Sequence, residues 1–117
     1  MNAGIQPQLQ QPPDWYWTGG LHDAVVLSVI PRENCLEICL DSTKAMLDRD
    51  IRKISLFNYK IQTPEVQLSE PTNVWWLRDH IQTLSNHRYL LEIIFETGRR
   101  KRKSFTVLFK SASIERG

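Results

Sequence analysis

The most regular hydrophobic pattern lies near the end of the chain. In residues 88–98, "RYLLEIIFETG", apolar side chains alternate with glutamates, and residues 104–116, "SFTVLFKSASIER", repeat the alternation. A period of two is typical of strands with one buried face. A connection opened by Gly98 joins the two runs, which predicts a β-hairpin. The positions expected to face the core are Leu91, Ile93, Phe95, Phe105, Val107 and Phe109.

Three earlier segments also indicate strands. Residues 21–30, "LHDAVVLSVI", are apolar on both faces, which is typical of a strand that is covered on both sides. Pro31 and Asn34 mark a turn, and residues 35–41, "CLEICLD", return as its hairpin partner. A third strand is expected over residues 51–61, "IRKISLFNYKI".

Two segments leave more than one structure open. Residues 42–50, "STKAMLDRD", fit a short helical turn capped by Ser42 or Thr43, or a loop. Residues 74–88, "VWWLRDHIQTLSNHR", fit a helix with Asn73 as its N-cap, or a strand. We favour the strand because two adjacent tryptophans suit a pleated surface better. As a strand, the segment places on one side Trp75, Leu77, Asp79 and Ile81.

The fold class that follows is mainly β, or α+β. We expect a single small domain with an antiparallel sheet of about five to six strands in hairpin order and at most one or two short helices. Residues 1–14 contain four Gln and three Pro and are predicted to be a flexible N-terminal arm, with the domain over residues 15–117. No apolar run approaches the roughly 20 residues that cross a bilayer, and no secretory signal pattern is present. We therefore expect a cytoplasmic protein and no membrane partner.

The two cysteines agree with a reducing compartment. Cys35 and Cys39 are four residues apart in a predicted strand, which separates them by about 13 Å, beyond the reach of a disulfide. Free, buried or half-buried thiols are the favoured interpretation. A redox pair or half of a zinc site is the alternative.

The charge is uneven along the chain. The net charge is +2, but five of the 15 basic residues are consecutive. One interpretation is that they bind an anionic partner, either a nucleic-acid backbone or an acidic protein face. The other is that they form a solvated hairpin tip that protects an edge strand from aggregation. We favour the solvated tip, so nucleic acid stays the lesser alternative. The five residues are Arg99, Arg100, Lys101, Arg102 and Lys103.

His22 and Asp23 are the first residues considered for chemistry. Adjacent strand residues point to opposite faces, so this pair is not expected to share a metal or act as a base and its orienting group. A structural role, with a hydrogen bond to turn backbone, is favoured. The alternative is a small metal-dependent or acid/base hydrolase centred on His22, with Asp79 or His80 brought near by the fold. Metal-ligand spacings and nucleophile motifs are absent, and we predict no metal and no cofactor.

The tryptophans are the residues we favour for binding. Adjacent tryptophans in a strand send one ring inward and the other to the opposite face. If that face is open it is a partner-binding patch, because large aromatics dominate interface energies, and if it is covered the rings belong to the core. The four are Trp15, Trp17, Trp75 and Trp76.

The order of several short motifs carries a family resemblance. "GGLHDAVVLSV", "LEICLD", "ISLFNYKI", "WWLRDHI", "YLLEIIFET" and "FTVLFKSASIE" follow one another over about residues 15–115. The series resembles a group of small bacterial domains of unknown function, some of them grouped with immunity proteins of polymorphic-toxin systems. The resemblance implies a compact, mostly β, non-catalytic protein that binds a partner. Immunity proteins against basic nucleases are usually acidic, whereas this chain has a net charge of +2.

The resulting hypothesis is a non-enzymatic cytoplasmic binding protein. Its partner would be another protein or a second copy of the chain. This hypothesis predicts that Trp76→Ala or Trp17→Ala abolishes association while thermal unfolding changes little.

Overall fold

A computed structural model of the chain describes residues 12–63, 74–97 and 101–117 and contains no helix in these ranges. This confirms the mainly β fold and its antiparallel sheet. Within the described residues, no helix has the length and hydropathy needed to cross a membrane. The strands are β1 (Val25–Pro31), β2 (Cys35–Asp41), β3 (Ile51–Phe57), β4 (Lys60–Ile61), β5 (Val74–Thr83), β6 (Tyr89–Thr97), β7 (Arg102–Phe109) and β8 (Ser111–Arg116).

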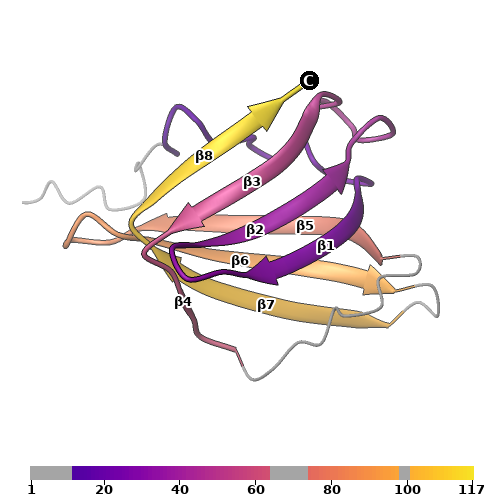
Figure 1. The fold of residues 1–117 in the computed structure, drawn as a ribbon. Coiled ribbons are helices and arrows are strands. Elements are labelled where there is room, and N and C mark those ends of the chain that lie inside the picture. Colours follow the sequence, from indigo (N-terminus) through magenta and orange to yellow (C-terminus); the bar gives the residue numbers. More distant parts are fainter. Residues whose placement is uncertain (1–11, 64–73, 98–100) are drawn as a thin grey trace, which may run out of the picture.

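The sheet is folded on itself into two halves. Its strand order is β4-β7-β6-β5-β1-β2-β3-β8, and in the described residues β5 and β1 meet at the single pair Val25 and Trp75. Figure 1 shows the half β1-β2-β3-β8 lying over the half formed by β5, β6 and β7. The chain crosses from one half to the other at Lys110, whose N–H donates to the carbonyl of Phe57 at 3.0 Å.

The sheet has more strands than the sequence predicts because two expected strands are each divided. The run 51–61 is broken at Asn58, which has a φ of 52°, a left-handed conformation that interrupts an extended chain. β3 therefore ends at Phe57, and β4 leaves to pair with β7. The run 104–116 is broken at Lys110, after which β8 pairs with β3 and not with β6.

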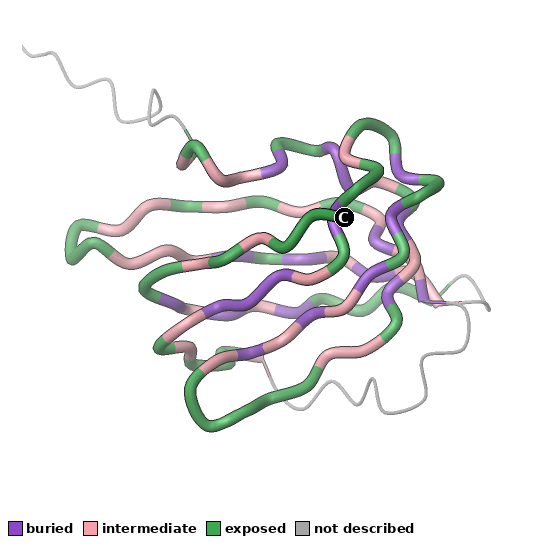
Figure 2. The backbone as a smooth tube through the Cα atoms, turned by 45° about the horizontal axis from the view of Figure 1, so that its top comes forward, coloured by how far each residue is buried: buried purple, intermediate pink, exposed green. Residues whose placement is uncertain are grey.

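The core lies between the two halves and follows the predicted alternation. Every inward position expected in β6 and β7 is buried, and β2 buries Leu36, Ile38 and Leu40 between its half-exposed cysteines. Figure 2 shows buried stretches on strands of both halves. Burial of each such side chain is worth roughly 1.5–3 kcal/mol, so facing rows of apolar residues are what hold the halves together.

Segment 74–83 is a strand, β5, as favoured from the sequence, but its faces differ from the expectation. The register with β6 shifts between Trp76 and Arg78, so Leu77 forms a bulge. A bulge inserts one extra residue into a strand and inverts the alternation beyond it. Trp76 is buried on the inner face and Trp75 is half-buried on the opposite face, and the bulge brings Asp79 and Ile81 to the side of Trp76 and not to that of Trp75.

β1 begins later than predicted and is not covered on both sides. Residues 21–23 form turns, and the strand starts at Val25. Val26 is fully buried, but Leu27 is 50% exposed and Ile30 is 36% exposed. Leu27 points outward because it follows the inward Val26, and the register shift between Val26 and Ser28 places Ile30 on the outer face as well.

The N-terminal segment, residues 12–24, runs beside β5. The Asp23 N–H donates to the carbonyl of Trp76 at 2.9 Å, and the Trp76 N–H donates to the carbonyl of Ala24 at 2.8 Å. The other side of the segment is held by the 42–50 loop, where the Met46 N–H donates to the carbonyl of His22 at 2.9 Å. Of the predicted flexible arm 1–14, residues 1–11 lie outside the described part of the structure.

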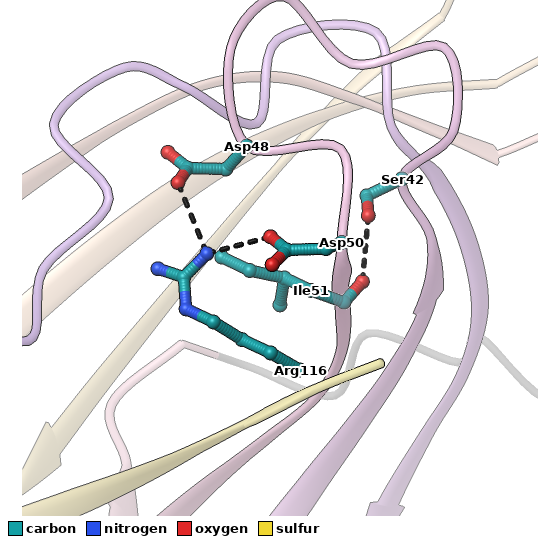
Figure 3. A network of polar contacts seen from close by, with 5 residues as sticks. All are labelled: Ser42, Asp48, Asp50, Ile51 and Arg116. Carbon is teal, nitrogen blue, oxygen red and sulfur yellow. Dashed lines mark hydrogen bonds and ion pairs between the residues drawn. The ribbon is translucent and has the colours of Figure 1, made fainter.

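The 42–50 segment is a loop of turns, the second of the two structures left open by its sequence. Figure 3 shows how it is fixed at both ends. Ser42, which is buried, donates its hydroxyl to the carbonyl of Ile51 at 2.7 Å. Arg116 of β8 lies 2.7 Å from Asp50 and 3.4 Å from Asp48 through Nη1. The loop is therefore fixed to the start of β3 by Ser42 and to β8 by Arg116.

Candidate functional site

Asp79 of β5 is the polar centre of the inner face. Its Oδ2 accepts hydrogen bonds from the indole Nε1–H groups of Trp17 at 2.8 Å and Trp76 at 2.6 Å. Its Oδ1 accepts a hydrogen bond from the hydroxyl of Tyr16. One carboxylate thus ties the N-terminal segment to β5, because two of its three donors come from residues 16 and 17.

Burial changes the acidity of this carboxyl. It raises the pKa of Asp79 from 3.8 to about 7, because removing the carboxylate from water disfavours its charged form. The three hydrogen-bond donors act to lower the pKa of Asp79, because each of them stabilises the charged carboxylate. A perturbed acid beside a surface hollow is a physical criterion for a functional site, although structural hydrogen-bond networks meet the same criterion.

The hollow lies where the N-terminal segment meets β5 and has a volume of about 300 Å³. Asp79 and His80, which are consecutive in β5, both line it, and the fold brings Tyr16 to them from the N-terminal segment. His22 is not among the lining residues. The lining consists of Pro12, Tyr16, Thr18, Gly19, Asp79, His80, Ile81 and Thr83.

His22 and Asp23 hold the bulge of β5. The expectation that they point to opposite faces is wrong, because they lie in a turn, where Asp23 has a φ of 74° and its Oδ1 lies 3.6 Å from Nε2 of His22. The Nδ1 of His22 lies 2.5 Å from the carbonyl oxygen of Leu77. Because a carbonyl only accepts, Nδ1 carries the proton. The bulge carbonyl is thereby satisfied by a side chain, and this hydrogen bond goes to strand backbone and not to the turn backbone that the sequence suggests.

Two of the four tryptophans lie in the core. Trp17 is 3% exposed and Trp76 is 0% exposed, and their rings meet edge to face at 5.5 Å. Side chains without accessible surface do not fit the predicted contact with a partner, and their removal cannot leave stability unchanged. Trp15 is half-buried against Tyr89 and Phe109, with ring centroids 5.5 and 5.8 Å away.

The basic hairpin between β6 and β7 is exposed where it is described. Arg99 and Arg100 lie outside the described residues, and Lys101, Arg102 and Lys103 are exposed. The Thr97 N–H donates to the carbonyl of Lys101 at 2.8 Å, which closes the hairpin. Arg102 lies 4.0 Å from Glu96, so part of the basic charge is already balanced within the protein.

The outer face of the half β1-β2-β3-β8 carries accessible apolar side chains, although the pattern of residues 21–30 predicts a strand that is covered on both sides. We call this set the apolar outer face. Register places Cys39 beside Ser28 and Lys53, and Cys35 beside Phe57, on this side of the sheet. Both cysteines are free, as predicted. The set is Leu27, Ile30, Cys35, Cys39 and Phe57, which are exposed or half-buried and belong to no buried cluster.

Two features of these sites had no usable signal in the sequence. The outward position of Ile30 depends on a bulge, which apolar patterning does not reveal. Tyr16 and Asp79 are far apart in the chain, so only the folded sheet brings them together. A weak signal for Asp79 was present, since a lone acid among apolar strand residues requires hydrogen-bond donors when it is buried.

Comparisons with known proteins add no relative. No family model matches the chain, no curated protein matches it, and no solved structure matches it. Among the described residues, no group of three or more His, Cys, Asp or Glu side chains is placed to hold a metal ion.

Proposed function

We propose that this chain is a non-enzymatic protein-interaction domain whose contact surface is the apolar outer face, and that the partner is a second copy of the chain. The observation that carries the proposal is the exposure of Leu27, at 50%, and Ile30, at 36%, on one strand of a rigid sheet. In an antiparallel sheet that has one face on the core and one in solvent, large aliphatic side chains normally point toward the core. Contact with a partner would remove both from water.

Association through the apolar outer face would use a surface that the monomer already presents. Fully burying a Leu or Ile side chain contributes roughly 1.5–3 kcal/mol. The backbone of β1 is already fixed by its pairing with β2, so little ordering cost opposes association. A hollow of about 520 Å³ that Leu27 and Cys39 line would receive a protruding side chain of the partner.

The charges on this face support a second copy as the partner. Arg32 lies 2.5 Å from Glu37, and Lys53 lies 3.7 Å from Glu115. These four charges are paired within one chain, which reduces the repulsion between two identical faces. A two-fold interface requires such a self-complementary patch.

The test is sedimentation velocity over a range of protein concentrations. We expect wild type to form dimers as concentration rises, and Leu27→Asp and Ile30→Asp to remain monomeric because each would bury an unpaired charge at the interface. Gln82→Asp, an exposed position of β5, is the matched control and should dimerise like wild type. A monomeric wild type, or dimers in both aspartate variants, would overturn the proposal.

Narrower and competing functions have less support. The resemblance to immunity proteins also favours a protein-interaction domain, but with a toxin as the partner in place of a second copy. The free cysteines support a cytoplasmic location for this function. A hydrolase centred on His22 is less supported, because Nδ1 of that ring is used by the Leu77 carbonyl. Nucleic-acid binding at the basic hairpin is less supported, because Glu96 lies beside Arg102 and Glu92 follows on the same face.

A further inference from the structure

The hollow between the N-terminal segment and β5 has the dimensions of a small-ligand site. Its volume of about 300 Å³ lies at the lower end of the range for such pockets. Its wall combines an apolar part, with Ile81 and Pro12, and a polar part, with Asp79, Tyr16 and Thr83. A few placed polar groups in a partly apolar hollow are the usual composition of a site for small molecules.

Asp79 has unused hydrogen-bonding capacity at one oxygen. A carboxylate offers about four acceptor positions, two on each oxygen. Oδ2 receives both indole N–H groups, whereas Oδ1 receives the Tyr16 hydroxyl alone among the described residues. One acceptor position on Oδ1 is therefore free for a donor that enters the hollow.

The charge of Asp79 also lacks a counterion. No Lys or Arg side chain lines the hollow in the part of the chain that the structure describes. Burial raises the pKa of Asp79 to about 7, the behaviour of a carboxylate without a cation against it. The other ionisable groups in the lining are Tyr16 and His80.

We propose that this hollow binds a small organic cation, an alkylammonium group whose N–H donates to Oδ1 of Asp79 while its carbon chain lies against Ile81. The Tyr16 ring adds a further attraction, since aromatic rings attract cations electrostatically. The site uses β5 and the N-terminal segment, so it is separate from the apolar outer face of β1, β2 and β3. It stands or falls independently of self-association.

The indole N–H groups of Trp17 and Trp76 are direct reporters of this event. Both donate to the carboxylate that would receive the cation, so their nuclear magnetic resonance signals respond when its electron density changes. The experiment titrates ¹⁵N-labelled full-length protein at pH 8 with butylammonium chloride. Parallel titrations use n-butanol, which has the same number of heavy atoms but no charge, and sodium chloride at equal ionic strength.

We expect both indole signals to shift and saturate with butylammonium, with a dissociation constant on the order of millimolar for so small a probe. Asp79→Asn should weaken binding at least tenfold, because it removes the charge. The asparagine retains the network, since its oxygen accepts from the indoles and its NH₂ donates to the Tyr16 oxygen. Glu33→Gln, an exposed carboxylate of the β1–β2 turn, is the control and should bind like wild type.

Two further titrations test the hollow and the charge of Asp79 separately. Thr83→Phe fills part of the hollow and leaves the Asp79 carboxylate intact, so it should also weaken binding. Lowering the pH to 5 should weaken binding in wild type and in His80→Gln alike, because protonation of Asp79 removes the attraction. Equal shifts with n-butanol or sodium chloride, equal binding by Asp79→Asn, or no saturable shift would each overturn the proposal.

Discussion

Trp76 and Asp79 are three residues apart in β5, yet their side chains meet on the same inner face, with Nε1 of the indole 2.6 Å from Oδ2 of the carboxylate. In a regular strand, residues three apart point to opposite faces. The bulge between Trp76 and Arg78 removes this difference. It places an acid beside the aromatic core, where Tyr16 and Trp17 also reach it.

The acidity of Asp79 predicts a specific dependence of stability on pH. Its pKa is about 7 in the folded chain against 3.8 for the ordinary group, so the folded state holds an extra proton between these values. The contribution of Asp79 to the unfolding free energy is therefore fully present below pH 4. As the pH rises to 7, the unfolding free energy decreases by roughly 4 kcal/mol because of this group.

Asp79→Asn isolates this contribution. Urea unfolding of wild type and variant between pH 4 and 8 should give a difference in unfolding free energy that shifts in favour of the variant as pH rises. Other titrating groups are common to both proteins and cancel in the difference. Parallel pH profiles for the two proteins would contradict the assignment.

The two adjacent tryptophans should differ sharply in their contribution to stability. Trp76→Ala removes a fully buried ring and one donor to Asp79, and we expect a loss of about 3–5 kcal/mol. Trp75→Ala removes a half-buried ring on the opposite face and should cost about 1 kcal/mol. Chemical unfolding followed by far-ultraviolet circular dichroism measures both, and similar losses would be evidence against the inward position of Trp76 and the outward position of Trp75.

Gly20 should tolerate no side chain, because it lies directly against Asp48 and the chain itself. A Cβ at this position would lie 2.9 Å from the carbonyl oxygen of Trp17 and would overlap the Asp48 carboxylate. We expect Gly20→Ala to cost about 1–3 kcal/mol through overpacking. Gly19→Ala meets no atom within 4 Å and should cost about 1 kcal/mol, from its φ of 74°. The two thermal unfolding midpoints test this order.

The loop network of Figure 3 contains one buried hydrogen bond and two exposed ion pairs, which should contribute differently to stability. Ser42→Ala leaves the buried carbonyl of Ile51 without its donor and should cost about 1–3 kcal/mol. Arg116→Ala breaks exposed ion pairs with Asp48 and Asp50 and should cost at most about 1 kcal/mol, less at high salt. Urea unfolding at low and high sodium chloride separates the two effects.

Alternation was sufficient to predict the strands but not their irregularities. The inward rows of β6 and β7 follow from a strict period of two, because each apolar residue is followed by an outward neighbour. The same rule fails in β5 and β1, where a bulge shifts every later side chain to the other face. Such a shift depends on pairing with a neighbouring strand, which a single segment does not encode.

The candidate site was predictable only in part for a related reason. The aromatic run at 15–17 and the pair at 75–76 are recognisable as unusual in the sequence, which leaves a partner-binding patch and a core position open, and Trp17 and Trp76 lie in the core. The Asp79 carboxylate permits their burial, because it satisfies both indole N–H groups. Trp17 is far from Asp79 in the sequence, and Trp76 reaches the same carboxylate only through the bulge of β5, so no local pattern connects the three residues.

The route of the chain through Lys110 has a consequence for folding. β3 pairs with β8 on the side away from β2, and this pairing includes Phe57 and Ser111. The free edge of β3 therefore cannot be paired until β8 has been synthesised. Pairings between segments so distant in sequence carry a large loop-closure entropy and slow the folding of β proteins. On the ribosome, the half that starts with β1 stays incomplete until the chain has passed residue 116, so its assembly is a late event.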